Sequence, residues 1–134
     1  MSNFFQNQTI ATVLIIIVTG SFFIISASLF TIYTKTYSLC QQTKQEYTGD
    51  CVKRLIQQSQ DESQTYKDRN DAIWALGQFA DKRAEKPLSE LYNGSVPSTK
   101  EPYDTMLSQY ELYKALKWIK RGNITSWLHR IINM

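Results

Sequence analysis

The sequence predicts an all-α protein: a single N-terminal transmembrane helix, then a short α-solenoid of about two helix hairpins, then a C-terminal capping helix. Three observations support this fold class. The chain contains one long uncharged apolar segment, its remaining apolar residues recur at helical spacing, and no segment alternates as a half-buried strand does. The expected domains are a short tail at 1–9, the transmembrane helix at 10–34, a stalk at 35–49, helical repeats at 50–122 and the C-terminal helix at 123–134.

The charged residues are confined to the part of the chain that follows the apolar segment. The first of them is Lys35, so all 15 basic and 12 acidic side chains lie in the last hundred of the 134 residues. The net charge of +3 therefore belongs to that part, and so small a surplus is ordinary for a soluble surface. It gives no argument for a nucleic-acid partner.

The apolar segment at 10–34 has the length and composition of a membrane span. It contains 25 residues without a charge, and a hydrocarbon core of ~30 Å needs roughly 20 helical residues. A buried helix of a soluble protein is one alternative, but such helices usually keep a polar stripe. A cleaved signal peptide is the other, and it would have a basic residue before a shorter apolar stretch. We expect a retained single-pass anchor, with the lipid bilayer as a partner.

Two signals just after this segment disagree about the side of the membrane on which the soluble domain lies. Lys35 and Lys44 follow the segment and no basic residue precedes it, which favours the cytoplasm. Cys40 and Cys51, the only cysteines, are spaced for a possible disulfide, which favours an oxidising compartment. Two free buried thiols would give the same sequence. The sequence leaves both the side and the disulfide open.

Five helices are expected after the stalk. They lie at 51–60, 66–80, 82–94, about 104–121 and 126–133. Asp50 or a neighbour caps the first, and Thr65 with Asp68 makes a capping-box-like start to the second. Gly94 is expected to stop the third helix and Gly122 the fourth.

The apolar face of the last helix needs a cover. It is formed by Trp127, Leu128, Ile131 and Ile132. We expect this helix to cap the second hairpin, because two hairpins alone leave the ends of a solenoid open. The alternative is a helix that lies on a membrane surface, since tryptophan beside His129 and Arg130 suits an interface.

Two of the predicted helices align with each other. Residues 69–79 align with residues 109–119 at an offset of 40, which pairs Ala75 with Ala115 and Leu76 with Leu116. Two helix hairpins of about this period are typical of an α-solenoid, in which each hairpin buries its apolar face against its neighbour.

The segment RNDAIWALGQFADKRAEKPLSELY resembles a bacterial HEAT-like repeat of the phycobilisome-lyase type. The matching positions are Arg69, Ala72, Ala75, Leu76, Gly77, Asp81, Arg83, Ala84 and Pro87. Ala80 stands where such repeats usually have glycine, and Gln109 and Glu111 stand where the first unit has Arg69 and Asp71. The whole chain is similar to small membrane-anchored HEAT-repeat proteins of unknown function. The resemblance implies a protein-binding or scaffolding fold, and it supplies no catalytic residues.

Little in the sequence points to catalysis. The single histidine, His129, has no nucleophile beside it, and with Cys40 and Cys51 it falls short of a closed zinc set. No glycine-rich phosphate-binding loop occurs. We therefore expect a protein that is not an enzyme and that has no cofactor or metal.

Trp74 and Trp118 are the candidate partner-binding residues. They lie at the margin of the apolar stripes of the two aligned helices, and large aromatics outside a core are frequent binding anchors. The alternative is a purely structural role, in which both side chains are packed between the hairpins. The expected function is a membrane-tethered scaffold that binds a protein partner or serves as an accessory subunit of a membrane complex.

Two alternatives to a scaffold come from other functional classes. One is a lyase or chromophore-handling enzyme, by analogy with the repeat type. The other is a sensor of anionic membrane surfaces, which would use the basic stripe Lys114, Lys117 and Arg121.

Overall fold

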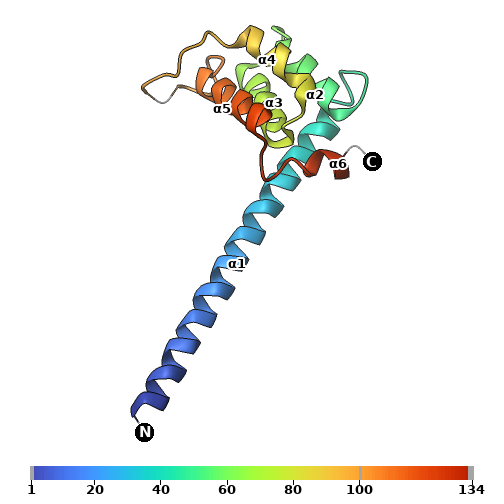
Figure 1. The fold of residues 1–134 in the computed structure, drawn as a ribbon. Coiled ribbons are helices and arrows are strands. Elements are labelled where there is room, and N and C mark those ends of the chain that lie inside the picture. The colour runs from blue at the N-terminus through green and yellow to red at the C-terminus, as the bar shows by residue number, and fades with distance from the viewer. Residues whose placement is uncertain (1, 100, 133–134) are drawn as a thin grey trace. The chain divides into compact units, whose positions relative to one another are not determined.

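The computed structural model describes residues 2–99 and 101–132, and in these residues it contains helices and no strand. The helices are α1 (Ser2–Gln42), α2 (Cys51–Gln60), α3 (Tyr66–Phe79), the 3₁₀ turn η1 (Lys82–Ala84), α4 (Glu85–Leu91), α5 (Gln109–Arg121) and α6 (Leu128–Ile132) (Figure 1). The predicted all-α class is confirmed. The chain divides into two compact units, with the boundary between Thr34 and Lys35.

The first unit is a single stretch of α1. By length and composition, this helix can cross a membrane, and its apolar side chains are exposed: Phe22 is 72% and Phe23 is 74% accessible. Its few hydroxyl groups bind the helix itself, as Thr19 Oγ1 donates to the carbonyl oxygen of Ile15 at 2.8 Å. Ser28, Thr31 and Thr34 make similar bonds, so these hydroxyl groups need no water and suit a lipid environment.

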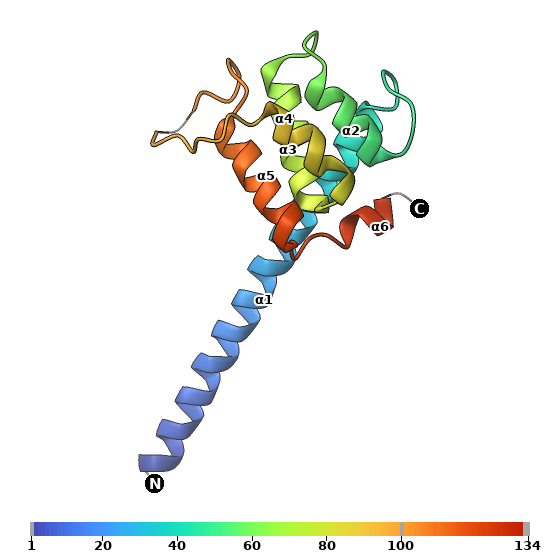
Figure 2. The same ribbon diagram turned by 45° about the horizontal axis from the view of Figure 1, so that its top comes forward.

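The second unit contains two helix pairs. α2 packs against α3 and α4 packs against α5, while α3 also contacts α5 and α2 also contacts α4 (Figure 2). The apolar side chains between them are fully buried, and the largest are Phe79, Leu55, Ile73, Leu76, Leu88, Leu112 and Ile119. Most of these residues lie on the faces that the helical spacing predicts. The prediction is partly wrong for α5, where Leu112 is buried instead of Tyr110 and Tyr113, which are 49% and 38% exposed.

α3 and α5 meet at Gly77. A Cβ atom added there would lie 3.0 Å from Cα of Ala115 and 3.0 Å from Cε3 of Trp118. A side chain at this position would require Ala115 and Trp118 to shift by a few tenths of an ångström, so glycine favours the close approach of the two helices. Ala115 is the residue that the repeat alignment pairs with Ala75.

The predicted starts of α2 and α3 are confirmed. Asp50 Oδ1 accepts a hydrogen bond from the backbone N–H of Lys53 at 2.8 Å, and Thr65 Oγ1 accepts one from the N–H of Asp68 at 3.2 Å. Each satisfies one of the N–H groups that a helix start leaves without a partner.

The predicted start of the fourth helix is wrong. α5 begins at Gln109 with Ser108 as its cap, and residues 104–108 form turns and irregular backbone. The cause is Asn70, a fully buried side chain on α3. Its amide nitrogen donates to the carbonyl oxygens of Tyr103 (2.7 Å) and Met106 (2.8 Å), and its oxygen accepts from the N–H of Ser108 at 2.9 Å. These bonds hold the segment before α5 in a non-helical path.

Two other predicted boundaries also differ. The third helix begins as the 3₁₀ turn η1 and ends at Leu91, three residues before Gly94. The last helix is only five residues long. It contacts α3, in the first pair, whereas the sequence predicts that it caps the second hairpin. Of its expected apolar face only Leu128 is fully buried.

Candidate functional site

A buried carboxylate organises one side of α3. The Asp71 side chain is 7% exposed, and its two oxygens accept hydrogen bonds from Lys35 Nζ at 2.7 Å and Lys67 Nζ at 2.8 Å. A third donor is the hydroxyl group of Tyr103, 3.2 Å from Oδ1. Asp71 thus joins the last part of α1, α3 itself and the loop that precedes α5.

The charges in this cluster fix its protonation. Burial by itself would raise the pKa of the Asp71 carboxyl, but the hydrogen bonds and positive charges of Lys35 and Lys67 outweigh burial and hold the pKa below its usual value. Burial and the negative charge of Asp71 raise the pKa of the Tyr103 hydroxyl. Asp71 is therefore ionised and Tyr103 is a hydrogen-bond donor throughout the physiological pH range.

Trp74 lies next to this cluster and is partly buried. Lys35 Nζ lies 4.5 Å from the centre of its ring, which is within the range of a cation–π interaction. The same ammonium group therefore contacts both Asp71 and Trp74.

Trp118 lies on α5 in a similar environment. Lys114 Nζ is 5.4 Å from the centre of the Trp118 ring and 5.2 Å from the centre of the Tyr110 ring. The same nitrogen donates to Glu111 Oε1 at 2.8 Å. Trp118 is also partly buried, and its ring lies against Gly77 of α3. Each of the two candidate tryptophans thus has a lysine over its ring.

The two tryptophans share one side of the α3–α5 pair. Trp74 precedes Gly77 by three positions and therefore lies on the same side of α3. Trp118 contacts Gly77 directly. We call the surface formed by Trp74, Tyr103, Tyr110, Lys114 and Trp118 the aromatic face.

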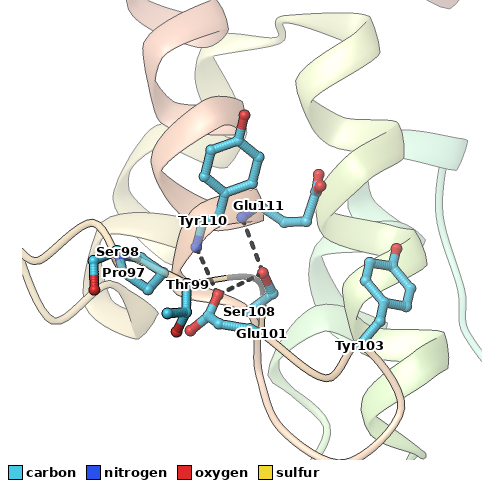
Figure 3. A pocket seen from close by; sticks show the side chains of 8 residues that line it. All are labelled: Pro97, Ser98, Thr99, Glu101, Tyr103, Ser108, Tyr110 and Glu111. Carbon is cyan, nitrogen blue, oxygen red and sulfur yellow. Dashed lines mark hydrogen bonds between the residues drawn. The ribbon is translucent and has the colours of Figure 1, made fainter.

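A pocket of about 420 Å³ lies at the start of α5 (Figure 3). It is lined by Pro97, Ser98, Thr99, Glu101, Tyr103, Ser108, Tyr110 and Glu111. Tyr103 and Tyr110 belong to the aromatic face as well, so pocket and face are continuous. The lining offers phenol, hydroxyl and carboxylate groups, which can bind the polar groups of a peptide.

The carboxylate of Glu101 occupies the N-terminus of α5. Its Oε2 accepts hydrogen bonds from the backbone N–H of Tyr110 at 3.0 Å and from Ser108 Oγ at 2.8 Å (Figure 3). Burial opposes ionisation, but these hydrogen bonds outweigh it and lower the pKa of Glu101. The negative charge of Glu101 thus interacts favourably with the positive end of the α5 helix dipole.

Cys40 and Cys51 form a disulfide, with their Cα atoms 5.2 Å apart. The buried guanidinium of Arg54 reinforces this junction, because it donates to the carbonyl oxygen of Cys40 at 3.1 Å, to Thr43 Oγ1 at 3.3 Å and to the carbonyl oxygen of Gly49. The end of α1 is therefore joined to α2 by a covalent bond and by the hydrogen bond to Cys40, and the other two hydrogen bonds hold the loop between the helices.

Several organising residues were not found by sequence reasoning. Asn70, Asp71 and Arg54 were overlooked because charged and amide side chains in short amphipathic helices are usually solvated. One signal was present: Asn70 and Asp71 directly precede the buried Ala72 and Ile73 and share part of their side of the helix. The side chain of His129 lies outside the described residues. Within the described chain, no group of three or more His, Cys, Asp or Glu side chains is placed to hold a metal ion.

Comparison of the chain with protein families, curated proteins and solved structures finds no significant match. The similarity to HEAT-like repeats therefore stays a prediction from the residues quoted above. Function has to be argued from the aromatic face and its surroundings.

Proposed function

We propose that the chain is a membrane-tethered helical scaffold, or an accessory subunit of a membrane complex, that holds a protein partner on the aromatic face. The observation that carries this proposal is the pair Trp74 and Trp118. Both rings are partly exposed on two adjacent helices, and the aromatic face to which we assign them shares Tyr103 and Tyr110 with a pocket that can accept a partner's side chain. Tryptophan and tyrosine in such settings are the residues that most often dominate binding energy.

The rigidity of the face supports this proposal. Asp71 binds both Lys35, which lies over the Trp74 ring, and Tyr103, and Asn70 fixes the loop that forms the pocket wall. A surface that is ordered before binding loses little conformational entropy when a partner docks. Loops that are free in solution would lose more.

The tether is the role we assign to α1. Its exposed apolar side chains have no partner in the first unit other than the helix itself, and a bilayer would cover them. The disulfide favours placing the second unit on the oxidising side of that membrane, because cytosolic thiols are kept reduced. It outweighs the two lysines that favour the cytoplasm, since two basic residues are a small count for the charge rule.

The helical arrangement supports a HEAT-like solenoid of two hairpins. α2 with α3 and α4 with α5 are the two hairpins, and α3 and α5 are the repeated helices that carry the aromatic face. The position where such repeats usually have glycine is Ala80, whose backbone has the left-handed φ of 51°. Left-handed backbone is what glycine adopts most readily.

The chromophore-handling alternative predicts a covalent or tight pigment at a cysteine. The bond between Cys40 and Cys51 occupies both thiols, which favours the scaffold over covalent pigment attachment. The membrane-surface alternative is favoured by a separate observation, which concerns the C-terminal residues.

Recovery of partners by the detergent-solubilised full chain tests the proposed face. Trp74→Ala and Trp118→Ala are each expected to lower the recovery of cross-linked partners at least several-fold. Tyr66→Ala is the matched control, because Tyr66 is an aromatic residue that is 43% exposed and lies outside the aromatic face. If both tryptophan variants keep their helical circular dichroism and recover partners as well as the control does, the aromatic face is not the binding site.

A further inference from the structure

We infer that the C-terminal segment, residues 122–132, binds the anionic headgroup region of the bilayer that holds α1. This inference rests on the proposed tether, and it assigns the segment a different surface from the aromatic face. We call residues 122–132 the tail. Four features of the tail lead to it: an uncovered apolar side, a fixed attachment to α3, an excess of positive charge and closeness to the residue that follows the apolar segment.

The tail exposes three large apolar side chains. Ile124 is 84%, Trp127 is 40% and Ile131 is 45% accessible. Backbone hydrogen bonds between residues three apart, from Asn123 to Arg130, form successive turns, and in such turns residues three apart, such as Ile124 and Trp127, lie on a common side. Thr125 and Leu128, on the other side, are 2% and 0% accessible. The side that packs on the domain is therefore already filled, and the exposed side needs a different cover.

The attachment of the tail to α3 is specific. Thr125 Oγ1 lies 3.0 Å from the carbonyl oxygen of Gln78 and 2.8 Å from Gln78 Oε1, and all of these atoms are buried. Asn123 Nδ2 donates to the carbonyl oxygen of Gly77 at 3.3 Å. Both contacts are at the end of α3, where helix carbonyl groups have no partner within the helix. The tail is thus held as a fixed surface.

Positive charge is concentrated around this apolar side. After Glu111 the chain contains five basic residues and no acidic residue. Three of them, Lys120, Arg121 and Arg130, border or lie in the tail and are exposed. Within the residues that the structure describes, no ion pair involves any of these three. Exposed tryptophan and isoleucine bordered by unpaired cations match the chemistry of an anionic lipid surface.

The second unit begins at the residue that directly follows the apolar segment. Lys35 is the first residue after the uncharged segment, so an inserted α1 would place it at the headgroup level. Lys35 contacts Trp74. Gln78, which binds the tail, follows Trp74 by one helical turn on the same side of α3, a rise of about 6 Å along the helix. The tether on the same chain and the positive charge around the exposed side lead us to favour lipid over a second protein as the cover.

Quenching of tryptophan fluorescence by lipid tests this inference. The full chain is placed in nanodiscs of phosphatidylcholine with or without phosphatidylglycerol, each made with and without lipid that carries a nitroxide near the headgroup. The contribution of Trp127 is obtained by subtracting the signal of Trp127→Phe. We expect this contribution to fall at least two-fold in nitroxide nanodiscs that contain phosphatidylglycerol.

The double variant Ile124→Asp, Ile131→Asp should abolish most of that quenching, because it replaces the apolar side by like charges that anionic lipid repels. Val96→Asp is the matched control, since Val96 is 46% exposed and lies outside the tail. It should leave the quenching of Trp127 unchanged.

Extraction with alkaline carbonate separates the two proposals. If the chain stays in the membrane and Trp127 is not quenched, the tail does not bind lipid and the tether stands. Equal quenching with and without phosphatidylglycerol would overturn the preference for anionic headgroups. If carbonate extracts the chain, the tether fails, and the inference that rests on it fails as well.

Discussion

Lys35 and Asp71 form an ion pair across 36 positions of the sequence, with Nζ and Oδ1 2.7 Å apart. Lys35 is the first charged residue of the chain and Asp71 is the buried centre of the cluster on α3. The contact therefore joins the residue that follows the apolar segment directly to the helix that carries Trp74. The contribution of this ion pair to the free energy of unfolding can be measured through the pH dependence of stability.

Asp71→Asn is expected to lower the free energy of unfolding of the second unit by about 1–3 kcal/mol at neutral pH, because it removes a buried charged acceptor. The pKa of Asp71 is lowered by folding, so its contribution is complete above the unfolded pKa of about 3.9 and is lost as the pH falls through the folded value. The difference between wild type and variant should therefore shrink below about pH 4. Urea unfolding of both proteins, monitored by tryptophan fluorescence at several pH values, measures this difference in stability. A difference that grows toward acid pH would contradict this assignment.

Gly77→Ala is expected to destabilise the second unit by about 1–3 kcal/mol through overpacking. The added methyl group would lie 3.0 Å from the backbone of Ala115, so α3 and α5 must separate to admit it. Gly20→Ala is the matched control, because a Cβ atom at Gly20 has no neighbour within 4 Å. Equal stability of the two variants in thermal unfolding would show that α3 and α5 are less closely packed than described.

Ala80→Gly is expected to stabilise the protein by about 0.5–1 kcal/mol, because alanine pays a steric cost in left-handed backbone. The φ of Ala80 is 51°, at the C-terminal cap of α3. The converse variant Gly122→Ala, at a φ of 87° with no atom within 4 Å of the added Cβ, should destabilise by a comparable amount through strain alone. The thermal midpoints of both variants, compared with that of the wild type, test these two predictions. A destabilised Ala80→Gly would refute the left-handed cap.

Reduction of the disulfide is expected to cost about 2–4 kcal/mol, because it restores the conformational freedom of the loop between Cys40 and Cys51 in the unfolded chain. Dithiothreitol should lower the thermal midpoint of the wild type and leave that of Cys40→Ser, Cys51→Ser unchanged. In intact cells, a thiol reagent that does not cross membranes should label the wild type only after reduction. Labelling without prior reduction would show free thiols, and labelling only after lysis would place the domain in the cytoplasm.

The fold class followed from the sequence because apolar spacing is a local property. Uncharged residues at 10–34 and the helical spacing around Ile73 and Leu116 need no knowledge of distant contacts. The start of α5 was missed for the opposite reason. Residues 104–108 have a helical pattern, but Asn70, more than thirty positions earlier, holds their backbone in another conformation.

The candidate site was partly predictable. Trp74 and Trp118 were identified because their positions follow from helical periodicity. The lysines over their rings and the carboxylate of Asp71 depend on how α1, α3 and α5 pack, which sequence spacing does not specify. The same holds for the tail, whose partner is α3 because Thr125 reaches Gln78.

The Cys40–Cys51 disulfide also closes an exposed loop. Lys44, Gln45 and Glu46 lie inside it and are accessible to proteases. A single cut among them would break the polypeptide between α1 and α2, but both pieces would stay covalently joined through the two sulfur atoms. Release of the second unit from α1 by a cut in this loop would therefore require a reductant as well as a protease.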